Sequence, residues 1–439
     1  MSEPPAVPGG PPPASPAPTQ GFGHKAGLIF FGRLISGIGQ LAMAAILVHV
    51  MDKASFAVLA FLLLLYGTVS SLVVMAMPEN VLFFLPKQSL GERKATAWQV
   101  ARILGLLGVA ASAVILACGL LPDLVFAEVP LAARYAPLMA AYALFDVPAL
   151  MLPNLLIAED RHRWASWVSI FQTAGQILAV LIPCILGMPL WAPLALLSGY
   201  GIVHLAALLL ALYLLYRDTK ATPCPVTLRE HLSFAVPLGL SGIVAKVTSQ
   251  FDKYVVLYVI GVMAFTDYSV GAWEIPLVNV LPFSIGAAIV PVLVRSFAQG
   301  RRREALETWK STIPKTSLLV VPISFVFLIC ADDFIELLFG RAYLGATVPL
   351  RLYTVILLWR VVEYGAILRA GGDTKAILNF MLILFLSNAV LSIPLAYLVG
   401  ANGPAIATVL ANVPTMAYVL HRIARLTDAE RREVLASVA

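Results

Sequence analysis

The chain has 439 residues, of which 60% are hydrophobic and only 12% are charged. A soluble domain carries about 25% charged residues, so this composition excludes an ordinary soluble enzyme, an intrinsically disordered protein and a disulfide-stapled secreted domain. The formal net charge of +6 would suit a nucleic-acid partner. In a membrane protein, however, an excess of lysine and arginine is typical of cytoplasmic loops, and we therefore expect no nucleic-acid partner.

Long apolar runs fill most of the chain after a proline-rich start. Eight prolines fall within the first 20 residues, which predicts a disordered tail over residues 1–25. The apolar runs that follow have the length of membrane-spanning helices. We expect twelve spans, at about 27–50, 55–76, 101–121, 135–157, 165–186, 191–216, 232–257, 268–292, 312–331, 347–368, 376–398 and 402–423.

The loops between these spans alternate strongly in basic charge. Of the 30 lysine and arginine residues, 22 fall in loops or at span ends on one side of the membrane, 3 fall on the other side and 5 lie deeper inside the spans. The positive-inside rule therefore predicts that both termini are cytoplasmic. The loops on the other side are too short to hold a separate enzymatic domain.

Sequence landmarks recur at a nearly constant offset. Ser36-Gly37-Ile38 in the first span matches Ser241-Gly242-Ile243 in the seventh, and Pro86 matches Pro291 at the same offset of 205 residues. Such a repeat predicts two six-helix halves around a central cavity, an architecture common among transporters. Coincidence in a composition rich in glycine and proline is the alternative.

The repeat and the loop charges divide the chain into five parts. The C-terminal part begins with Thr427-Asp428-Ala429-Glu430, a capping-box pattern that predicts a short helix. The expected parts are a cytoplasmic tail at 1–25, an N-terminal lobe at 26–216, a cytoplasmic linker at 217–231, a C-terminal lobe at 232–425 and a cytoplasmic tail at 426–439.

Polar residues repeat at helical spacing in the first and seventh spans and form two basic stripes. Two such stripes facing one cavity would bind an anionic ligand such as a phosphate. Snorkelling to the membrane interface is the alternative for Arg33 and Lys253, because both lie near a span end. The candidate substrate-binding residues are Arg33 and Gln40 in the first span and Lys246, Ser249, Gln250 and Lys253 in the seventh.

Charged residues inside spans are costly, so each of them marks a partner, a cavity or a function. Asp146 and Glu274 have no evident partner nearby in the sequence, which makes them candidates for binding a coupling proton or sodium ion. Asp252 either pairs with a basic group on another helix or accepts such a cation. Arg360 and Glu363 are three residues apart in the tenth span, where they either neutralise each other or take part in substrate binding and gating.

Motifs of soluble catalysis are missing from the sequence. It contains no Walker A loop, no Gly-x-Ser-x-Gly nucleophile elbow and no His-Glu-x-x-His zinc motif. We therefore expect a protein that is not an enzyme and that holds no cofactor or metal, apart from a coupling H⁺ or Na⁺.

Several stretches resemble the Wzx-type polysaccharide (oligosaccharide-lipid) flippases, which share a superfamily with the multidrug and toxic-compound extruders. The resemblance covers about residues 26–425. It is carried by Phe234-Ala235-Val236-Pro237, Gln250-Phe251-Asp252-Lys253, Phe339-Gly340-Arg341-Ala342-Tyr343, Leu368-Arg369-Ala370-Gly371-Gly372-Asp373-Thr374-Lys375 and Gly403-Pro404-Ala405-Ile406-Ala407-Thr408.

The resemblance implies an all-α polytopic fold in which two six-helix lobes form a V that opens alternately to each side of a bacterial inner membrane. It implies a lipid-linked oligosaccharide, on an undecaprenyl-pyrophosphate carrier, as the substrate. Arg33 and Lys246 would then contact the pyrophosphate or an acidic sugar. The expected partners are this substrate, membrane lipids and other polysaccharide assembly proteins such as a polymerase, and the expected state is a monomer.

Two other functions are compatible with the sequence. A cation-coupled multidrug extruder of the same superfamily would favour carboxylates in its cavity, whereas the predicted spans hold five basic and four acidic residues. A polytopic polysaccharide polymerase or ligase would need acid–base residues in the short loops on the outer side.

Overall fold

The computed structural model describes residues 37–220, 222–272, 276–359 and 361–436, and these residues form helices and connecting turns without a strand. Nine stretches of the described residues are long and apolar enough to cross a membrane. One of them, Lys375–Leu426, contains two helices, and the described part of the first predicted span is a shorter apolar helix, Gly37–Val50. The prediction of an all-α, multi-pass membrane protein is confirmed.

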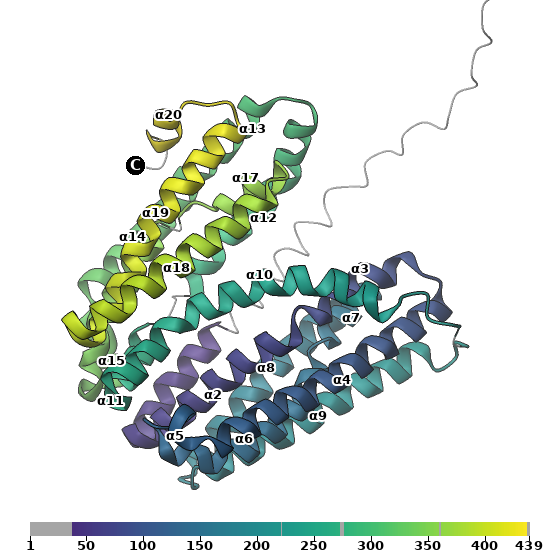
Figure 1. Ribbon diagram of the computed structural model, residues 1–439, viewed down its shortest axis with the longest axis vertical. Helices are drawn as coiled ribbons and strands as arrows, with labels where there is room; N and C mark the ends of the chain where they lie inside the picture. The colour runs from purple at the N-terminus through teal and green to yellow at the C-terminus, as the bar shows by residue number, and fades with distance from the viewer. Residues whose placement is uncertain (1–36, 221, 273–275, 360, 437–439) are drawn as a thin grey trace, which may run out of the picture.

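The first half of the chain forms a bundle in which α4, α6, α8 and α9 pack side by side, with α2 against α6 (Figure 1). Three short helices, α3, α5 and α7, connect the long ones. The helices are α2 (Lys53–Val74), α3 (Asn80–Phe84), α4 (Leu90–Leu120), α5 (Pro122–Val125), α6 (Pro130–Ala149), α7 (Leu152–Ala158), α8 (His162–Ile185) and α9 (Trp191–Tyr216).

The second half forms another bundle, in which α18 packs against α19 and α12 packs against α14 and α17. A π-helical turn at Val256–Ile260 ends the long helix α10. The helices are α10 (Leu228–Val255), α11 (Val262–Gly271), α12 (Pro276–Ala298), α13 (Arg302–Lys310), α14 (Thr312–Ile329), α15 (Ala331–Phe339), α16 (Thr347–Trp359), α17 (Tyr364–Ala370), α18 (Thr374–Val399), α19 (Gly403–Leu426) and α20 (Arg431–Ala436).

Two predicted spans are broken in the structure. The predicted span 135–157 is divided between α6 and α7, where Pro153 lacks the N–H that a continuous helix needs. The predicted span 347–368 is divided between α16 and α17. Near this break the indole Nε1–H of Trp309 donates to the Glu363 carbonyl over 3.2 Å, so another helix satisfies a backbone group there.

Helix capping explains two further differences from the predicted boundaries. α4 begins at Leu90, well before the predicted 101, because Ser89 and Glu92 form a capping box. The capping box predicted at Thr427 is wrong. Thr427 instead follows the last turn of α19, where its hydroxyl donates to the Ile423 carbonyl over 2.8 Å, and the terminal helix α20 begins at Arg431.

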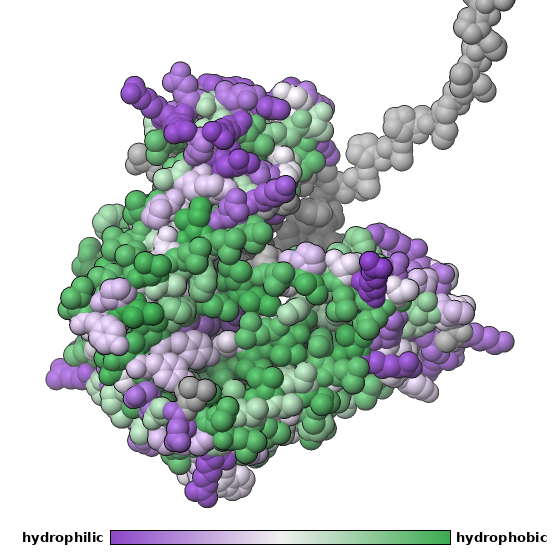
Figure 2. All heavy atoms as spheres, in the orientation of Figure 1, coloured by the Kyte–Doolittle hydropathy of each residue, from purple (hydrophilic) through white to green (hydrophobic). Residues whose placement is uncertain are grey.

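The two bundles form a V in Figure 1. They meet where α5, α11 and α15 lie, which we call the closed end, and diverge toward α3, α13 and α20, which we call the open end. Hydrophilic residues gather at the tips of the V and hydrophobic residues cover the broad faces between them (Figure 2). Large apolar side chains point outward from these faces, among them Leu106, Leu318 and Val390, which are 70–75% exposed. Such a belt fits a lipid environment.

Helix α10 contacts both bundles, packing on α2 and α3 in the first and on α18 in the second. Its closest approach to α2 is at Gly239, where a Cβ atom would come within 2.5 Å of the Met75 backbone. Met75 and Ala76 themselves have positive φ angles of 44° and 54°, which end α2 sharply beside α10. The absence of a side chain at Gly239 therefore sets how closely α10 can approach the first bundle.

We expect Gly239→Ala to destabilise the protein by about 1–3 kcal/mol, because the added methyl group meets backbone that cannot move without shifting a helix. The measurement is the thermal unfolding midpoint of the purified protein in detergent. Gly242→Ala is the matched control, because a Cβ atom there meets nothing within 4 Å. Equal midpoints for the two variants would contradict this account of the contact.

Candidate functional site

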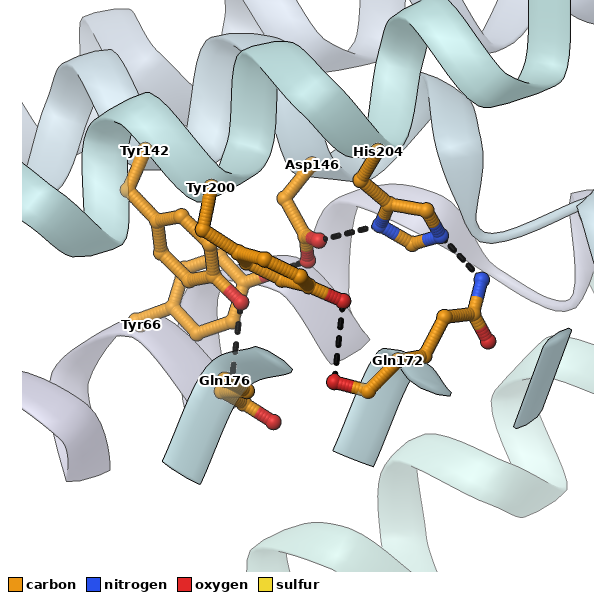
Figure 3. Close-up of polar contacts among 7 residues, drawn as sticks. All are labelled: Tyr66, Tyr142, Asp146, Gln172, Gln176, Tyr200 and His204. Atoms are coloured by element: carbon orange, nitrogen blue, oxygen red, sulfur yellow. Dashed lines mark hydrogen bonds and ion pairs between the residues drawn. The ribbon is translucent and has the colours of Figure 1, made fainter. Parts of the chain in front are cut away.

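A buried carboxylate, Asp146 of α6, lies at the centre of a polar network inside the first bundle (Figure 3). The Asp146 residue is only 5% exposed. Its Oδ1 lies 2.7 Å from Nδ1 of His204 on α9, and its Oδ2 accepts a short hydrogen bond from the hydroxyl of Tyr66 on α2. Both carboxylate oxygens are therefore satisfied by donors from other helices, as a charge inside a membrane protein requires.

The network continues from His204 to α8, where His204 Nε2 contacts the side-chain amide nitrogen of Gln172. The Tyr200 ring stacks on the His204 ring at 5.8 Å, and its hydroxyl donates to the Gln172 carbonyl over 2.9 Å. Gln176, one turn further along α8, donates to the Tyr142 hydroxyl over 3.2 Å. The partners around Asp146 thus come from α2, α6, α8 and α9 (Figure 3).

This arrangement fits one tautomer of His204. When Nδ1–H donates to Asp146, Nε2 carries a lone pair and accepts from the Gln172 amide. A proton added to the imidazole would set two N–H donors face to face at Gln172. The Gln172 amide would then have to turn its oxygen toward the ring, which would change the contact between α8 and α9.

The basic stripe predicted in the seventh span lies on α10. The Lys246 ammonium reaches across to α2, where a Cβ atom at Gly67 would lie 3.7 Å from Nζ. Among the described residues, Lys246 has no hydrogen-bond acceptor and no acidic partner, and Lys253 repels it electrostatically. One turn away, the Gln250 side-chain oxygen is buried without a hydrogen-bond partner. Ser249 is exposed, and its hydroxyl donates to the Lys246 carbonyl over 2.8 Å.

Two polar groups without partners, one turn apart on a half-buried helix face, favour a ligand site. A buried polar atom that lacks a partner costs free energy, and a bound ligand would remove that cost. The ammonium and the amide would suit an anion with several oxygen atoms.

Asp252 lies on the same helix but is held in a different way. It is 1% exposed, and its Oδ2 accepts hydrogen bonds from the hydroxyls of Tyr268 on α11, over 2.8 Å, and of Tyr353 on α16. A basic partner from another helix was one of the two alternatives for Asp252; among the described residues, the groups that reach its carboxylate from other helices are two tyrosine hydroxyls. These bonds tie α10 to the second bundle.

Glu363, between α16 and α17, accepts a hydrogen bond from Arg369 over 2.7 Å, and its side chain packs on Gly286 of α12. Arg369 is thus the cationic partner of Glu363 among the described residues, whereas the predicted pairing with Arg360 stays a prediction. Three predicted site residues, Arg33, Glu274 and Arg360, lie outside the described residues, so their roles stay predictions. Gln40 is exposed on the helix Gly37–Val50.

An ion pair joins the two bundles at the closed end. The Lys53 ammonium at the start of α2 lies 2.5 Å from Asp267 of α11, donates to the Ala342 carbonyl over 3.1 Å and sits 5.0 Å from the centre of the Tyr343 ring. The side chains of Lys53 and Asp267 are only 28% and 22% exposed. Burial raises the pKa of the Asp267 carboxyl above its ordinary value, against the lowering effect of Lys53.

Two tyrosines of the second half add hydrogen bonds to the first bundle. Tyr254 donates to the hydroxyl of Thr68 over 2.9 Å, and Tyr258 donates to the Val125 carbonyl over 2.6 Å. An ion pair and two directional hydrogen bonds thus join the bundles, beside a hydrophobic core that contains residues of both, such as Phe56 and Tyr343.

The comparisons with known proteins agree with this architecture. Residues 46–348 match the family described as "Polysaccharide biosynthesis protein". The chain belongs to this polysaccharide biosynthesis protein family. No curated protein sequence matches the chain.

Solved structures of transporters share the fold of this polysaccharide biosynthesis protein. A transporter of the MOP superfamily from Pyrococcus furiosus has a TM-score of 0.60 at 15% identity, over 92% of this chain and 96% of that chain. A multidrug resistance MATE family transporter in an outward-facing conformation has a TM-score of 0.62 at 15% identity, over 92% and 97%. The lipid II flippase MurJ in an inward closed conformation has a TM-score of 0.62 at 14% identity, over 94% and 90%. The predicted MATE-like fold is confirmed.

Removal of the cation at the closed end should let the two bundles separate there. We expect Lys53→Gln to increase a long-distance population between spin labels at Leu131 and Leu337, which are exposed on the two bundles. The reason is that the variant leaves the half-buried Asp267 carboxylate without its cation. The measurement is electron–electron double resonance on a cysteine-free background at pH 7, with Lys53→Arg as the charge-retaining control.

The raised pKa of Asp267 gives this experiment a pH dependence of known sign. In the closed state, the Asp267 carboxyl takes up a proton more readily than in the open state. Protonation of Asp267 therefore favours closure at pH values below the raised pKa, and this contribution is lost above it. Lowering the pH toward about 4 should therefore reclose the Lys53→Gln variant. Wider opening in acid would contradict this description of the Asp267 site.

Proposed function

We propose that this member of the polysaccharide biosynthesis family is a flippase, which moves lipid-linked oligosaccharide units from the cytoplasmic to the outer leaflet of a bacterial inner membrane. The observation that carries the proposal is the pair of unsatisfied groups on α10, the Lys246 ammonium and the Gln250 oxygen, at the face that α10 turns toward α2. A pyrophosphate would supply the acceptor oxygens that Lys246 lacks. The lipid tail would stay in the bilayer, beside the apolar outer faces.

The proposed orientation follows from the basic loops. They lie at the open end of the V, where the first turn of α4 around Arg93 and the helices α13 and α20 are found, so the positive-inside rule predicts that this end is cytoplasmic. In that orientation the V faces the leaflet where lipid-linked units are made, and the Lys53–Asp267 pair closes it on the outer side. Transport would then be a relative movement of the proposed lobes, residues 26–216 and 232–425.

Loss of the Lys246 ammonium on α10 should slow transport strongly while the protein still folds. We expect Lys246→Ala to slow flipping at least about tenfold, because one hydrogen bond to a charged group contributes roughly 1.5–3 kcal/mol. Lys246→Arg should keep part of the activity. The measurement uses proteoliposomes that contain an undecaprenyl-pyrophosphate saccharide, and follows its exposure to a membrane-impermeant glycosidase.

Lys315→Ala is the matched control, because it removes an exposed lysine in the first turn of α14, outside the proposed site. If Lys246→Ala transports normally, the anion site is overturned. The same vesicles test the alternative of a multidrug extruder, for which cationic dyes rather than the saccharide lipid would be transported. Elongation of the saccharide by the purified protein would support the polymerase or ligase alternative.

We also propose that a proton taken up at the Asp146–His204 pair is coupled to transport. Both Asp146 oxygens already accept from O–H and N–H donors, so a sodium ion would have to displace them, whereas a proton needs only the imidazole. The other groups that face the pair are the side chains of Tyr66, Tyr142, Tyr200 and Gln172, none of which ordinarily carries a charge at neutral pH.

An imposed pH gradient separates this coupling role from a structural one. We expect the pH gradient to speed flipping by the unaltered protein. Asp146→Asn should reduce this response at least about tenfold, while exchange of the lipid without a gradient continues. Asp160→Asn is the control, because it makes the same chemical change in a side chain that is 89% exposed. A response to an imposed sodium gradient instead of the pH gradient would disprove proton coupling.

A further inference from the structure

The open end of the second bundle carries a recess that the proposed transport does not use. It has a volume of about 340 Å³ and lies between the end of α12, the start of α13, the turn after α17 and the end of α19. Three of its lining residues are arginines, Arg302, Arg422 and Arg425, which come from two helices far apart in the sequence. Hydrophilic residues gather at this tip in Figure 2.

Two of the arginines are fixed in place by carboxylates. Arg422 donates through Nε to Asp373 over 3.0 Å, and Asp373 also caps α18 by accepting from the Ala376 amide over 3.1 Å. Arg302 donates to Asp428 over 2.8 Å. Asp428 has a φ angle of 53°, an uncommon conformation for a residue other than glycine, and it sits in the turn that places its carboxylate beside Arg302.

The third arginine has no such partner. No carboxylate among the described residues pairs with Arg425, although the Arg425 charge repels a positive charge on His421. The recess therefore holds three guanidinium groups against the single lining carboxylate Asp373, with Asp428 behind Arg302. A second recess of about 560 Å³ adjoins it and shares Arg302; its further arginines, Arg301 and Arg303, pair with Glu304 and Glu433. The charge excess favours an anion, and planar guanidinium groups favour phosphate.

The walls and the position of the recess indicate what carries that phosphate. Phe297 and Leu426 supply apolar walls, at the ends of the apolar helices α12 and α19. At this level of a membrane protein, phosphates of lipid headgroups meet the protein surface, and basic pockets there bind anionic lipids. α20 is joined to α13 by two ion pairs, because Glu433 pairs with Lys310 over 2.6 Å and with Arg303 over 2.9 Å.

We propose that this recess is a binding site for a phosphate group, held by Arg425 together with Arg302 and Arg422, and that an anionic lipid headgroup is its natural source. The site is independent of the transport proposed above, because none of its residues lies on α10 or in the Asp146 network. A bound headgroup would fix α13, α19 and the loop after α17 to one another at the open end of the second bundle.

The test measures binding to the purified full-length protein in a neutral detergent. The probes are short-chain phosphatidylglycerol, a diacylglycerol of the same chain length, and inorganic pyrophosphate, each titrated against the thermal unfolding midpoint. We expect saturable stabilisation by phosphatidylglycerol and none by the diacylglycerol. Arg425→Ala should weaken the apparent affinity about tenfold, since it removes one charged donor.

Arg432→Ala is the matched control, because Arg432 is an exposed arginine of α20 at the same tip that does not line the recess. Its affinity should stay within about twofold of the unaltered protein, and Arg425→Lys should fall between the two. Arg425 makes no ion pair with any residue that the structure describes, so unfolding midpoints without ligand should be equal, which separates lost binding from lost folding.

The outcomes distinguish the two sources of phosphate. Stabilisation by the lipid alone supports a headgroup site, whereas competition by pyrophosphate at similar concentration supports the phosphate site with a soluble source. Equal weakening by Arg425→Ala and Arg432→Ala would mean diffuse attraction to a basic surface and would overturn the proposal, as would equal stabilisation by the uncharged diacylglycerol.

Discussion

The need to satisfy every polar group inside a membrane organises this structure. Each described carboxylate of the predicted spans meets that need with side-chain donors: Asp146 with His204 and Tyr66 and Asp252 with two tyrosines, all from other helices, and Glu363 with Arg369 of the helix that follows it. Lys246 and the oxygen of Gln250 do not have such partners among the described residues. Other buried polar atoms, such as the hydroxyls of Ser324 and Thr347, also lack a partner. A lysine ammonium, however, carries a full charge, and natural proteins tolerate such costs chiefly at functional sites.

Composition and loop charge were sufficient to predict the fold class, because they depend on whether a segment lies in lipid or in water and not on the details of side-chain packing. Apolar runs of the right length must be helices in lipid, where every backbone group needs an internal partner. The same signals missed the division of the fourth and tenth spans. A hydropathy pattern does not register which backbone groups a neighbouring helix can satisfy, as Trp309 does for the Glu363 carbonyl at the second break.

The candidate site was predictable where it lies on one helix and hidden where it joins several. Lys246, Ser249 and Gln250 follow helical spacing, so their shared face can be read from the sequence. Asp146 and His204 are 58 residues apart, and Tyr353 is 101 residues from Asp252. No local pattern links residues at such distances. A lone histidine in an apolar span was the one available signal for His204, and it gave no indication of which carboxylate it would meet.

Helix α10 connects the two bundles. Asp252 fastens it to α11 and α16 through tyrosine hydroxyls, whereas its contacts with α2 are a glycine packed on Met75, a lysine beside Gly67 and one hydrogen bond from Tyr254. α10 is also tied to the first bundle by directional contacts with α3, because His231 Nδ1 lies 3.1 Å from the side-chain oxygen of Asn80 and the Phe234 ring stacks on the Phe83 ring. Movement between the bundles would therefore have to break contacts of α10 with one of them, and any shift of α10 relative to α2 would change what Lys246 faces.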